Sequence, residues 1–171
     1  MLFIARSEHS DYLIEKQNID LNSLIQELVH YFEFLAEDKN MTFVLALETG
    51  IHLYANTDLF KRALSNLMIN AIDYGLQDQE IVISTQSTQH HVEIEVLTKN
   101  IFIDDPHLNH VFDRFYQIDP SRHHKAKTGG LGLSIVKSIM MLHQAEASAY
   151  NSPQGIVFKL KMNRLENFDN V

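Results

Sequence analysis

The feature that most constrains the fold of this chain is a glycine-rich loop that runs directly into a helix pattern, at residues 128–137. Gly129, Gly130 and Gly132 precede apolar residues that recur at helical spacing. Glycines before a helix let backbone N–H groups approach a phosphate, and the N-terminus of the helix adds partial positive charge. The loop predicts a site for a phosphate-bearing ligand, although such glycines also occur in ordinary loops.

A second helix is predicted from about residue 58 to residue 75, with apolar side chains along one stripe. Asn66 and Asn70 are four residues apart in it and share a face. Side-chain carbonyl oxygens suit Mg²⁺, which prefers oxygen ligands and completes its shell with water and phosphates. Two asparagines alone also fit a solvated helix surface; beside the glycine loop they favour a magnesium–phosphate site.

Three stretches occur in a fixed order: Arg-Ala-Leu-Ser-Asn-Leu-Met-Ile-Asn-Ala-Ile at 62–72, Val-Phe-Asp-Arg-Phe-Tyr at 111–116 and the glycine loop at 128–133. They resemble the N, F and G2 boxes of the ATP-binding domain of sensor histidine kinases. That domain belongs to the superfamily of gyrase, heat-shock chaperone and mismatch-repair ATPases. The likeness runs from about residue 1 to residue 160. Residues 1–6, 34–38 and 62–66 are most similar to the heavy-metal (copper/silver) sensor kinases.

The resemblance implies ATP and Mg²⁺ as cofactors, with Asn66 and Asn70 as catalytic residues and Asn70 as the magnesium ligand. The residues implied to bind ATP are Asn66, Asn70, Asp73, Tyr74, Thr98, Arg122, Lys125, Lys127, Thr128, Gly129, Gly130, Leu131, Gly132 and Leu133. Among these, the three cations would neutralise phosphate charge, whereas the two leucines are expected chiefly to pack. Phe112, Phe115 and Tyr116 are expected to anchor a lid rather than to stack on a base.

Several residues depart from the family pattern. Thr98 stands where the family has an aspartate that reads the adenine amino group, and Asn100 and Phe102 replace glycines. A threonine hydroxyl accepts a hydrogen bond without charge assistance, which costs about 1 kcal/mol or roughly five- to tenfold in affinity. Asp73 occupies a position that usually holds a cation. These changes leave open a degenerate domain that binds ATP weakly.

The fold class predicted is α/β in the α+β sense: a mixed, mostly antiparallel sheet with three helices on one face. Strands are expected at 42–47, 51–54, 81–83, 92–96, 145–150 and 156–162, with a turn at 86–91. A further helix would be capped by Asp20 or Asn22 and would bury a stripe from Leu21 to Leu35. We expect residues 1–16 to be the tail of a dimerisation helix, 17–165 the ATP-binding domain with its lid at about 100–130, and 166–171 a tail.

Composition excludes several classes of function. A net charge of −8 argues against nucleic acid as a partner, and the absence of cysteine excludes disulfides and zinc–thiolate sites. No apolar run reaches the roughly 18 residues that a membrane span needs. The paired histidines at 90–91 and 123–124 lack a supporting ligand framework, so metal sensing by this segment is disfavoured.

The function implied by the resemblance is transfer of the ATP γ-phosphoryl group to a histidine, then to a response regulator. No histidine here lies in the family's phosphoacceptor motif, so the acceptor would come from a dimerisation domain of the same protein. The parent would be a membrane-anchored homodimer whose cytoplasmic portion includes this chain, in a bacterial inner membrane; the chain by itself, which may be monomeric, is not expected to autophosphorylate. The alternatives are a degenerate scaffold or phosphatase-biased partner, and another ATPase of the superfamily, such as a kinase that acts on serine.

Overall fold

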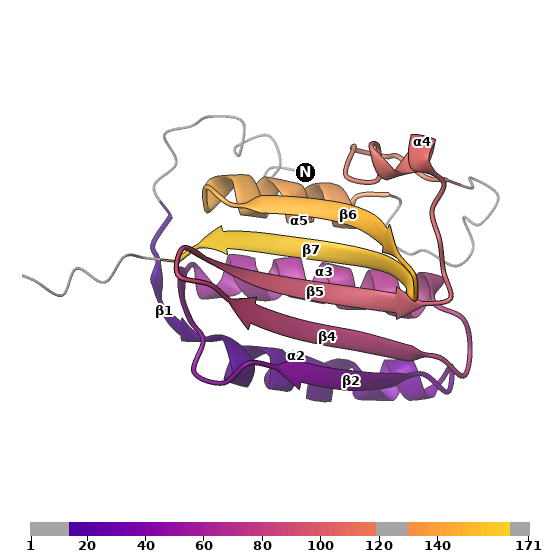
Figure 1. Ribbon diagram of the computed structural model, residues 1–171, viewed down its shortest axis with the longest axis horizontal. Coiled ribbons are helices and arrows are strands. Elements are labelled where there is room, and N and C mark those ends of the chain that lie inside the picture. The colour runs from indigo at the N-terminus through magenta and orange to yellow at the C-terminus, as the bar shows by residue number, and fades with distance from the viewer. Residues whose placement is uncertain (1–13, 119–129, 165–171) are drawn as a thin grey trace, which may run out of the picture.

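The computed structural model describes residues 14–118 and 130–164. These residues form a layer of strands in front of a layer of helices (Figure 1). The strands are β1 (Gln17–Asp20), β2 (Thr42–Leu47), β3 (His52–Ala55), β4 (Glu80–Ser87), β5 (His91–Lys99), β6 (Glu146–Ser152) and β7 (Gly155–Asn163). The helices are α2 (Leu21–Glu37), α3 (Thr57–Tyr74), α4 (Asp105–Leu108) and α5 (Gly132–Leu142).

The main sheet has five strands in the order β2-β4-β5-β7-β6, while β1 and β3 form a separate antiparallel pair. Only β2 and β4 run parallel, joined through β3 and α3; the other neighbours are antiparallel. Figure 1 shows α2, α3 and α5 together on one face of this sheet. The predicted fold class is therefore confirmed.

The core forms between the helices and the inward side chains of the central strands. Along β5, Val92, Ile94 and Val96 are buried and alternate with half-buried polar or charged residues. Leu64 and Leu67 of α3 are fully buried in the same cluster. Burial of each such side chain contributes roughly 1.5–3 kcal/mol, so the helices are fixed to the sheet mainly by apolar contact.

Helix α2 begins as predicted at Asp20, whose carboxylate accepts a hydrogen bond from the Ser23 backbone N–H at 2.9 Å. This bond lowers the pKa of Asp20. The expected stripe is wrong at its end, because Leu35 is 47% exposed whereas Ala36 is buried. The stripe continues from Phe32 by a step of four residues to Ala36, which leaves Leu35 at its edge.

Two other predictions need correction or limits, and one strand was missed. Strand β1 was not predicted from the sequence; its four residues gain order by pairing with β3. The turn between β4 and β5 is shorter than expected, because the ladder extends to the pair Ser87–Val92. Of the predicted N-terminal helix tail, residues 14–16 are not helical and residues 1–13 lie outside the described residues.

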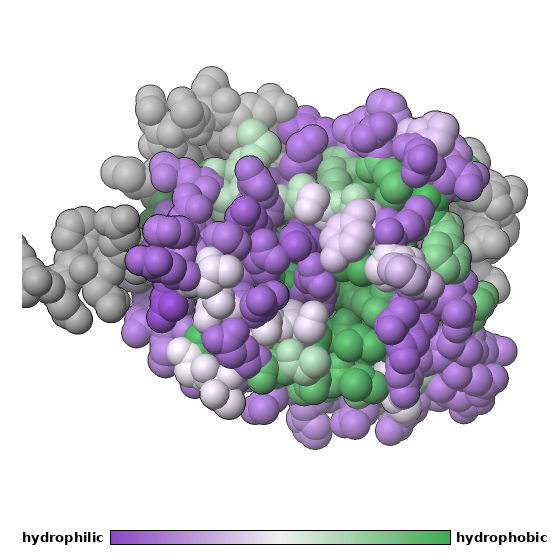
Figure 2. Space-filling model, viewed as in Figure 1, coloured by the Kyte–Doolittle hydropathy of each residue, from purple (hydrophilic) through white to green (hydrophobic). Residues whose placement is uncertain are grey.

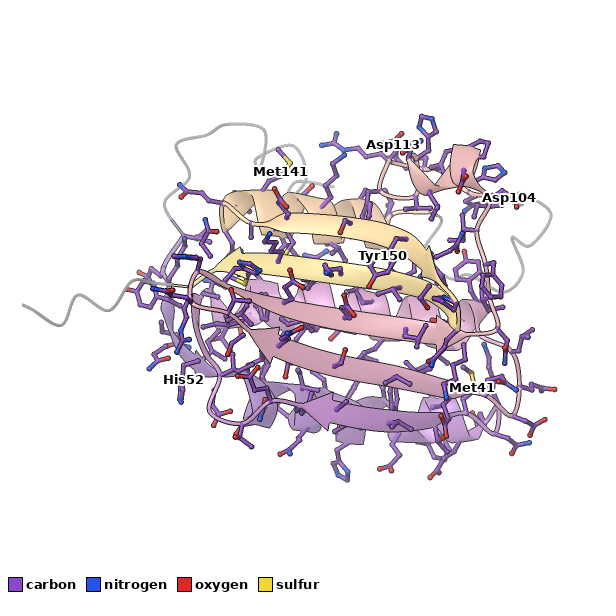
Figure 3. All side chains as sticks on the ribbon, viewed as in Figure 1. Met41, His52, Asp104, Asp113, Met141 and Tyr150 are labelled. Atoms are coloured by element: carbon purple, nitrogen blue, oxygen red, sulfur yellow. The ribbon has the colours of Figure 1, made fainter. Side chains whose placement is uncertain are left out.

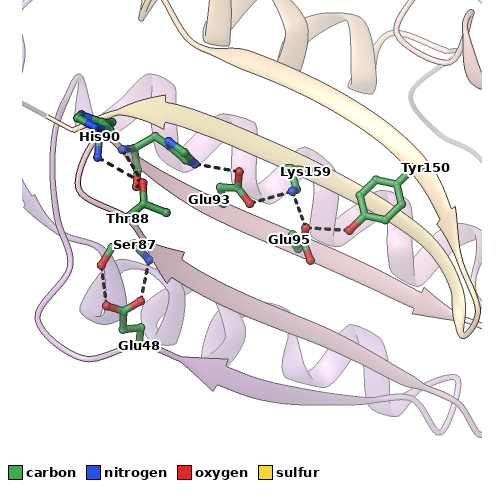
Figure 4. A network of polar contacts seen from close by, with 9 residues as sticks. Glu48, Ser87, Thr88, His90, Glu93, Glu95, Tyr150 and Lys159 are labelled. Carbon is green, nitrogen blue, oxygen red and sulfur yellow. Dashed lines mark hydrogen bonds and ion pairs between the residues drawn. The ribbon is translucent and has the colours of Figure 1, made fainter.

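The outer face of the sheet, opposite the helices, carries a charged network (Figure 4). Lys159 pairs with Glu93 at 2.8 Å and with Glu95 at 3.0 Å, and the Tyr150 hydroxyl donates to Glu95 at 2.8 Å. The two carboxylates raise the pKa of Lys159. Figure 2 shows that apolar surface also lies on this face, between stretches of hydrophilic surface. No helix among the described residues is long and apolar enough to cross a membrane.

His143 joins the end of α5 to the start of α3. It is 5% exposed, its Nδ1 lies 2.8 Å from the Ile139 carbonyl oxygen, and its Nε2 accepts a hydrogen bond from the Asn56 backbone N–H at 3.0 Å. Nε2 can accept only in the neutral imidazole with the proton on Nδ1. Burial lowers the pKa of His143 and so favours the neutral form that this geometry requires.

We expect the domain to lose stability on acidification because of His143. Below its ordinary pKa of 6.5, the unfolded chain binds a proton that the folded chain does not. This contribution to the free energy of unfolding is therefore retained above that pH and falls below it, by at most about 1.4 kcal/mol per pH unit. Denaturant titrations between about pH 5 and pH 8 measure this slope. His143→Gln should flatten it and His90→Gln, in an exposed turn, should not; equal slopes in the wild type and His143→Gln would contradict the assignment.

Candidate functional site

Asn66 and Asn70 lie on one flank of α3, and both are half-buried. The helix is fixed at its start by Asn56, whose side chain accepts a hydrogen bond from the Leu59 backbone N–H at 3.0 Å. The Asn66 side-chain amide donates to the Arg62 carbonyl at 2.9 Å, which orients its oxygen. The Asn70 side chain makes no hydrogen bond within residues 14–118 and 130–164.

The start of α5 lies directly against Asn66. A Cβ atom added to Gly132, the first residue of α5, would lie 3.4 Å from Asn66 Oδ1. Helices α3 and α5 pack side by side behind the sheet (Figure 1). The structure thus brings two distant stretches, the asparagine helix and the end of the glycine loop, together in the helical layer behind the sheet.

The residues around Gly132 pack the loop onto the body of the domain. Leu131 and Leu133 are both half-buried, and Leu133 packs against the core. The Ser134 hydroxyl donates to the Leu131 carbonyl at 2.9 Å. Gly130 has a left-handed φ of 77°, and a Cβ there would lie 3.0 Å from the Tyr116 carbonyl oxygen. Gly130 is therefore needed both for its left-handed conformation and for the close approach of the end of the predicted lid to Phe115 and Tyr116.

Of the three aromatic residues expected to anchor the predicted lid, one, Phe112, packs against the sheet. Phe112 is buried edge-to-face against Phe158, with ring centroids 6.1 Å apart. The Tyr116 hydroxyl lies 2.6 Å from His107 Nδ1, which is a contact within the predicted lid itself. Phe115 was expected to anchor as well, but it is 63% exposed with a φ of 61°, because the tight turn that seats its neighbours directs it outward.

Thr98 lies at the end of β5 on the helix-facing side, and it is 2% exposed. Its hydroxyl makes no hydrogen bond with any residue in the described part of the chain. Gly155 allows this close packing, because a Cβ there would lie 2.2 Å from the Thr98 carbonyl oxygen. Asn100 takes a left-handed φ of 59°, which is the backbone conformation that glycine favours, whereas Phe102 places a 58% exposed ring where the family has a glycine.

Asp73 and Tyr74 lie in the last turn of α3, and both residues have interaction partners. The residue that sequence reasoning missed at this end is Lys39, whose ammonium group donates to the backbone carbonyls of Ile72 and Asp73. No local pattern marks Lys39, since its partners lie more than thirty residues away in the chain.

Five of the predicted ATP-binding residues lie outside the described residues: Arg122, Lys125, Lys127, Thr128 and Gly129. Their roles stay predictions. Within the described residues no group of three or more histidine, cysteine or acidic residues is placed to hold a metal ion.

Residues 55–165 match the family model of histidine kinase-, DNA gyrase B- and HSP90-like ATPases. The chain belongs to this family. It is 32% identical to the sensor histidine kinase CusS of Escherichia coli K12, over 95% of this chain and 34% of CusS. The chain thus spans about a third of the length of this relative. The predicted kinship with sensor histidine kinases is confirmed.

Two solved structures share the fold. Full-length ShkA in complex with AMPPNP gives a TM-score of 0.82 at 17% identity, over 94% of this chain and 34% of that chain. ThkA in complex with the response regulator TrrA gives a TM-score of 0.76 at 24% identity, over 94% of this chain and 46% of that chain. Both structures support the arrangement of sheet and helices described above.

Alanine should change the stability of the domain differently at Gly130, two residues before α5, and at Gly132, its first residue. Gly130→Ala forces a side chain into a left-handed conformation against backbone, so we expect a loss of about 1–2 kcal/mol in the free energy of unfolding. Gly132→Ala places a methyl group at ordinary contact distance from Asn66, so we expect no loss beyond about 0.5 kcal/mol. Denaturant titration of the two variants measures both values, and equal losses would contradict the geometry.

Proposed function

We propose that this chain is the catalytic ATP-binding domain of a membrane sensor histidine kinase, most like the heavy-metal subgroup. It would bind Mg-ATP and donate the γ-phosphoryl group to a histidine on a dimerisation domain of the same protein, for relay to a response regulator. The observation that carries the proposal is the contact between Asn66 and Gly132. It puts side-chain oxygens beside backbone N–H groups at the start of a helix, where a nucleotide phosphate chain fits.

The residues present fit a bound magnesium ion. Asn70 is half-buried, and its amide is not engaged with the described residues, so its oxygen is available as a ligand. Asn66 lies one turn earlier, with its oxygen toward α5. When bound, Mg²⁺ would neutralise phosphate charge. Asn70 would hold the metal, and Asn66 would orient the phosphate chain.

In the proposed reaction, a nitrogen of the acceptor imidazole forms a bond to the γ-phosphorus as the bond to the β,γ-bridging oxygen breaks. ADP leaves with that electron pair. The domain itself would supply no nucleophile: its part would be to position ATP and to stabilise developing charge. ShkA was solved with AMPPNP and ThkA with a response regulator, which supports the proposed ligand and the proposed partner.

A degenerate scaffold is the second candidate, and particular residues favour it. Thr98 offers a neutral hydroxyl where the family has a carboxylate, and Phe102 replaces a glycine with an exposed ring. Asp73 adds a carboxylate to the helix end nearest the predicted phosphates. A domain of this kind would keep the fold while binding nucleotide weakly or not at all.

The test is a calorimetric titration of the chain with ATP, with and without Mg²⁺. We expect Asn70→Ala to weaken binding about tenfold or more when Mg²⁺ is present and much less when it is absent, because the metal ligand is lost. The matched control is Asn163→Ala. Asn163 pairs with His91 at one end of the β5–β7 ladder, whereas Thr98 pairs with Ile156 at the other end, so this variant should bind ATP like the wild type. If folded wild-type protein binds no ATP at millimolar concentrations (roughly the upper end of ordinary enzyme–substrate affinity), the scaffold replaces the kinase as the proposal.

A further inference from the structure

The turn between α2 and β2 fixes the backbone of Lys39. Its N–H donates to the Ala36 carbonyl at 3.0 Å, and the N–H of Met41 donates to the same carbonyl at 2.9 Å. Asn40 between them adopts a left-handed φ of 52°, which ends the helix tightly. The Lys39 side chain therefore leaves from a rigid turn rather than from a free loop.

From this turn, the half-buried Lys39 side chain reaches the C-terminus of α3. Its Nζ donates to the Ile72 carbonyl and, at 3.3 Å, to the Asp73 carbonyl. Helix α3 has no basic residue in its own last turn. The last carbonyls of a helix carry partial negative charge, which a cation there stabilises. Lys39 thus provides from another segment the cation that α3 lacks.

The same turn also holds the chain that follows α3. The Asp78 backbone N–H donates to the Lys39 carbonyl at 3.3 Å. Met41 packs so closely on Gly75 that a Cβ there would lie 2.3 Å from the Met41 methyl carbon. Figure 3 shows Met41 at the same end of the sheet as Asp104, which precedes α4. The turn therefore holds the end of α3 in place at the edge of the candidate site.

The groups that Lys39 contacts differ from those contacted by three other lysines of the domain. Lys61, Lys99 and Lys159 each contact a carboxylate, which offsets their charge. The contacts of Lys39 are with neutral carbonyl oxygens. The partial negative charge at the end of α3 would repel an anionic ligand near Asn70, and the positive charge of Lys39, bonded to the carbonyls at that end, opposes this repulsion.

We propose that Lys39 is a positioning residue that sets the electrostatic potential at the end of α3 and thereby favours nucleotides with a charged phosphate chain. This inference rests on the proposed function, since it requires nucleotide beside Asn70. Lys39 acts through the end of α3 and does not itself touch the ligand. Because its effect is electrostatic, it should scale with the charge of the ligand and weaken with salt.

The experiment compares ATP with adenosine, each measured by displacement of a fluorescent ATP analogue from wild type, Lys39→Met and Lys39→Arg. We expect Lys39→Met to weaken ATP binding about five- to tenfold and adenosine binding less than about twofold. Lys39→Arg should stay within about twofold of the wild type for both ligands. Lys61→Met removes the same charge from the other end of α3 and should leave ATP affinity unchanged.

Each outcome decides the inference. An equal loss for ATP and adenosine in Lys39→Met would mean that Lys39 is merely structural, and an unchanged ATP affinity would mean that its charge is not felt; either overturns the proposal. If Lys39→Met does not fold, the test uses the Lys39→Arg variant. Lys39→Arg must then keep the wild-type ratio of ATP affinity to adenosine affinity and the wild-type salt dependence of ATP binding. A change in either would overturn the proposal. Absence of ATP binding to the wild type would instead refute the proposed function itself.

Discussion

The candidate site depends on the position of one helix, α3, which is held along its length and at both ends. Its apolar stripe is buried against the sheet, and α5 lies against its flank at Asn66. His143 bonds to the backbone at its start, and Lys39 bonds to the carbonyls at its end. A helix fixed in this way holds Asn66 and Asn70 in a constant orientation, which would preorganise the proposed nucleotide site.

Charge is the second constraint, because an acidic chain is proposed to bind a polyanion. On the outer face of the sheet, Lys159 is paired with Glu93 and Glu95. At the other layer, the start of α5 offers partial positive charge, and Lys39 cancels the negative end of α3. Local dipoles and one well-placed cation can therefore set a potential that net charge does not predict.

The sequence predicted the main elements well because their signals are local. The apolar stripe of α3, the alternation of β5 and the Asp20 cap each follow from side chains within a few residues of one another. It failed where order comes from distant partners. Strand β1 exists because β3 pairs with it, and Phe115 is exposed because the turn around it is set by its neighbours.

The local patterns of the chain indicate a two-layer fold, a helix with paired asparagines, a glycine loop and the family to which these motifs belong. Which of these segments meet follows from the way they pack in three dimensions. The contact of Gly132 with Asn66 and the bonds from Lys39 to the end of α3 join residues that no local periodicity relates. The physical reason is that packing a helical layer on a sheet fixes distances between segments, whereas periodicity fixes only which face of a segment is buried.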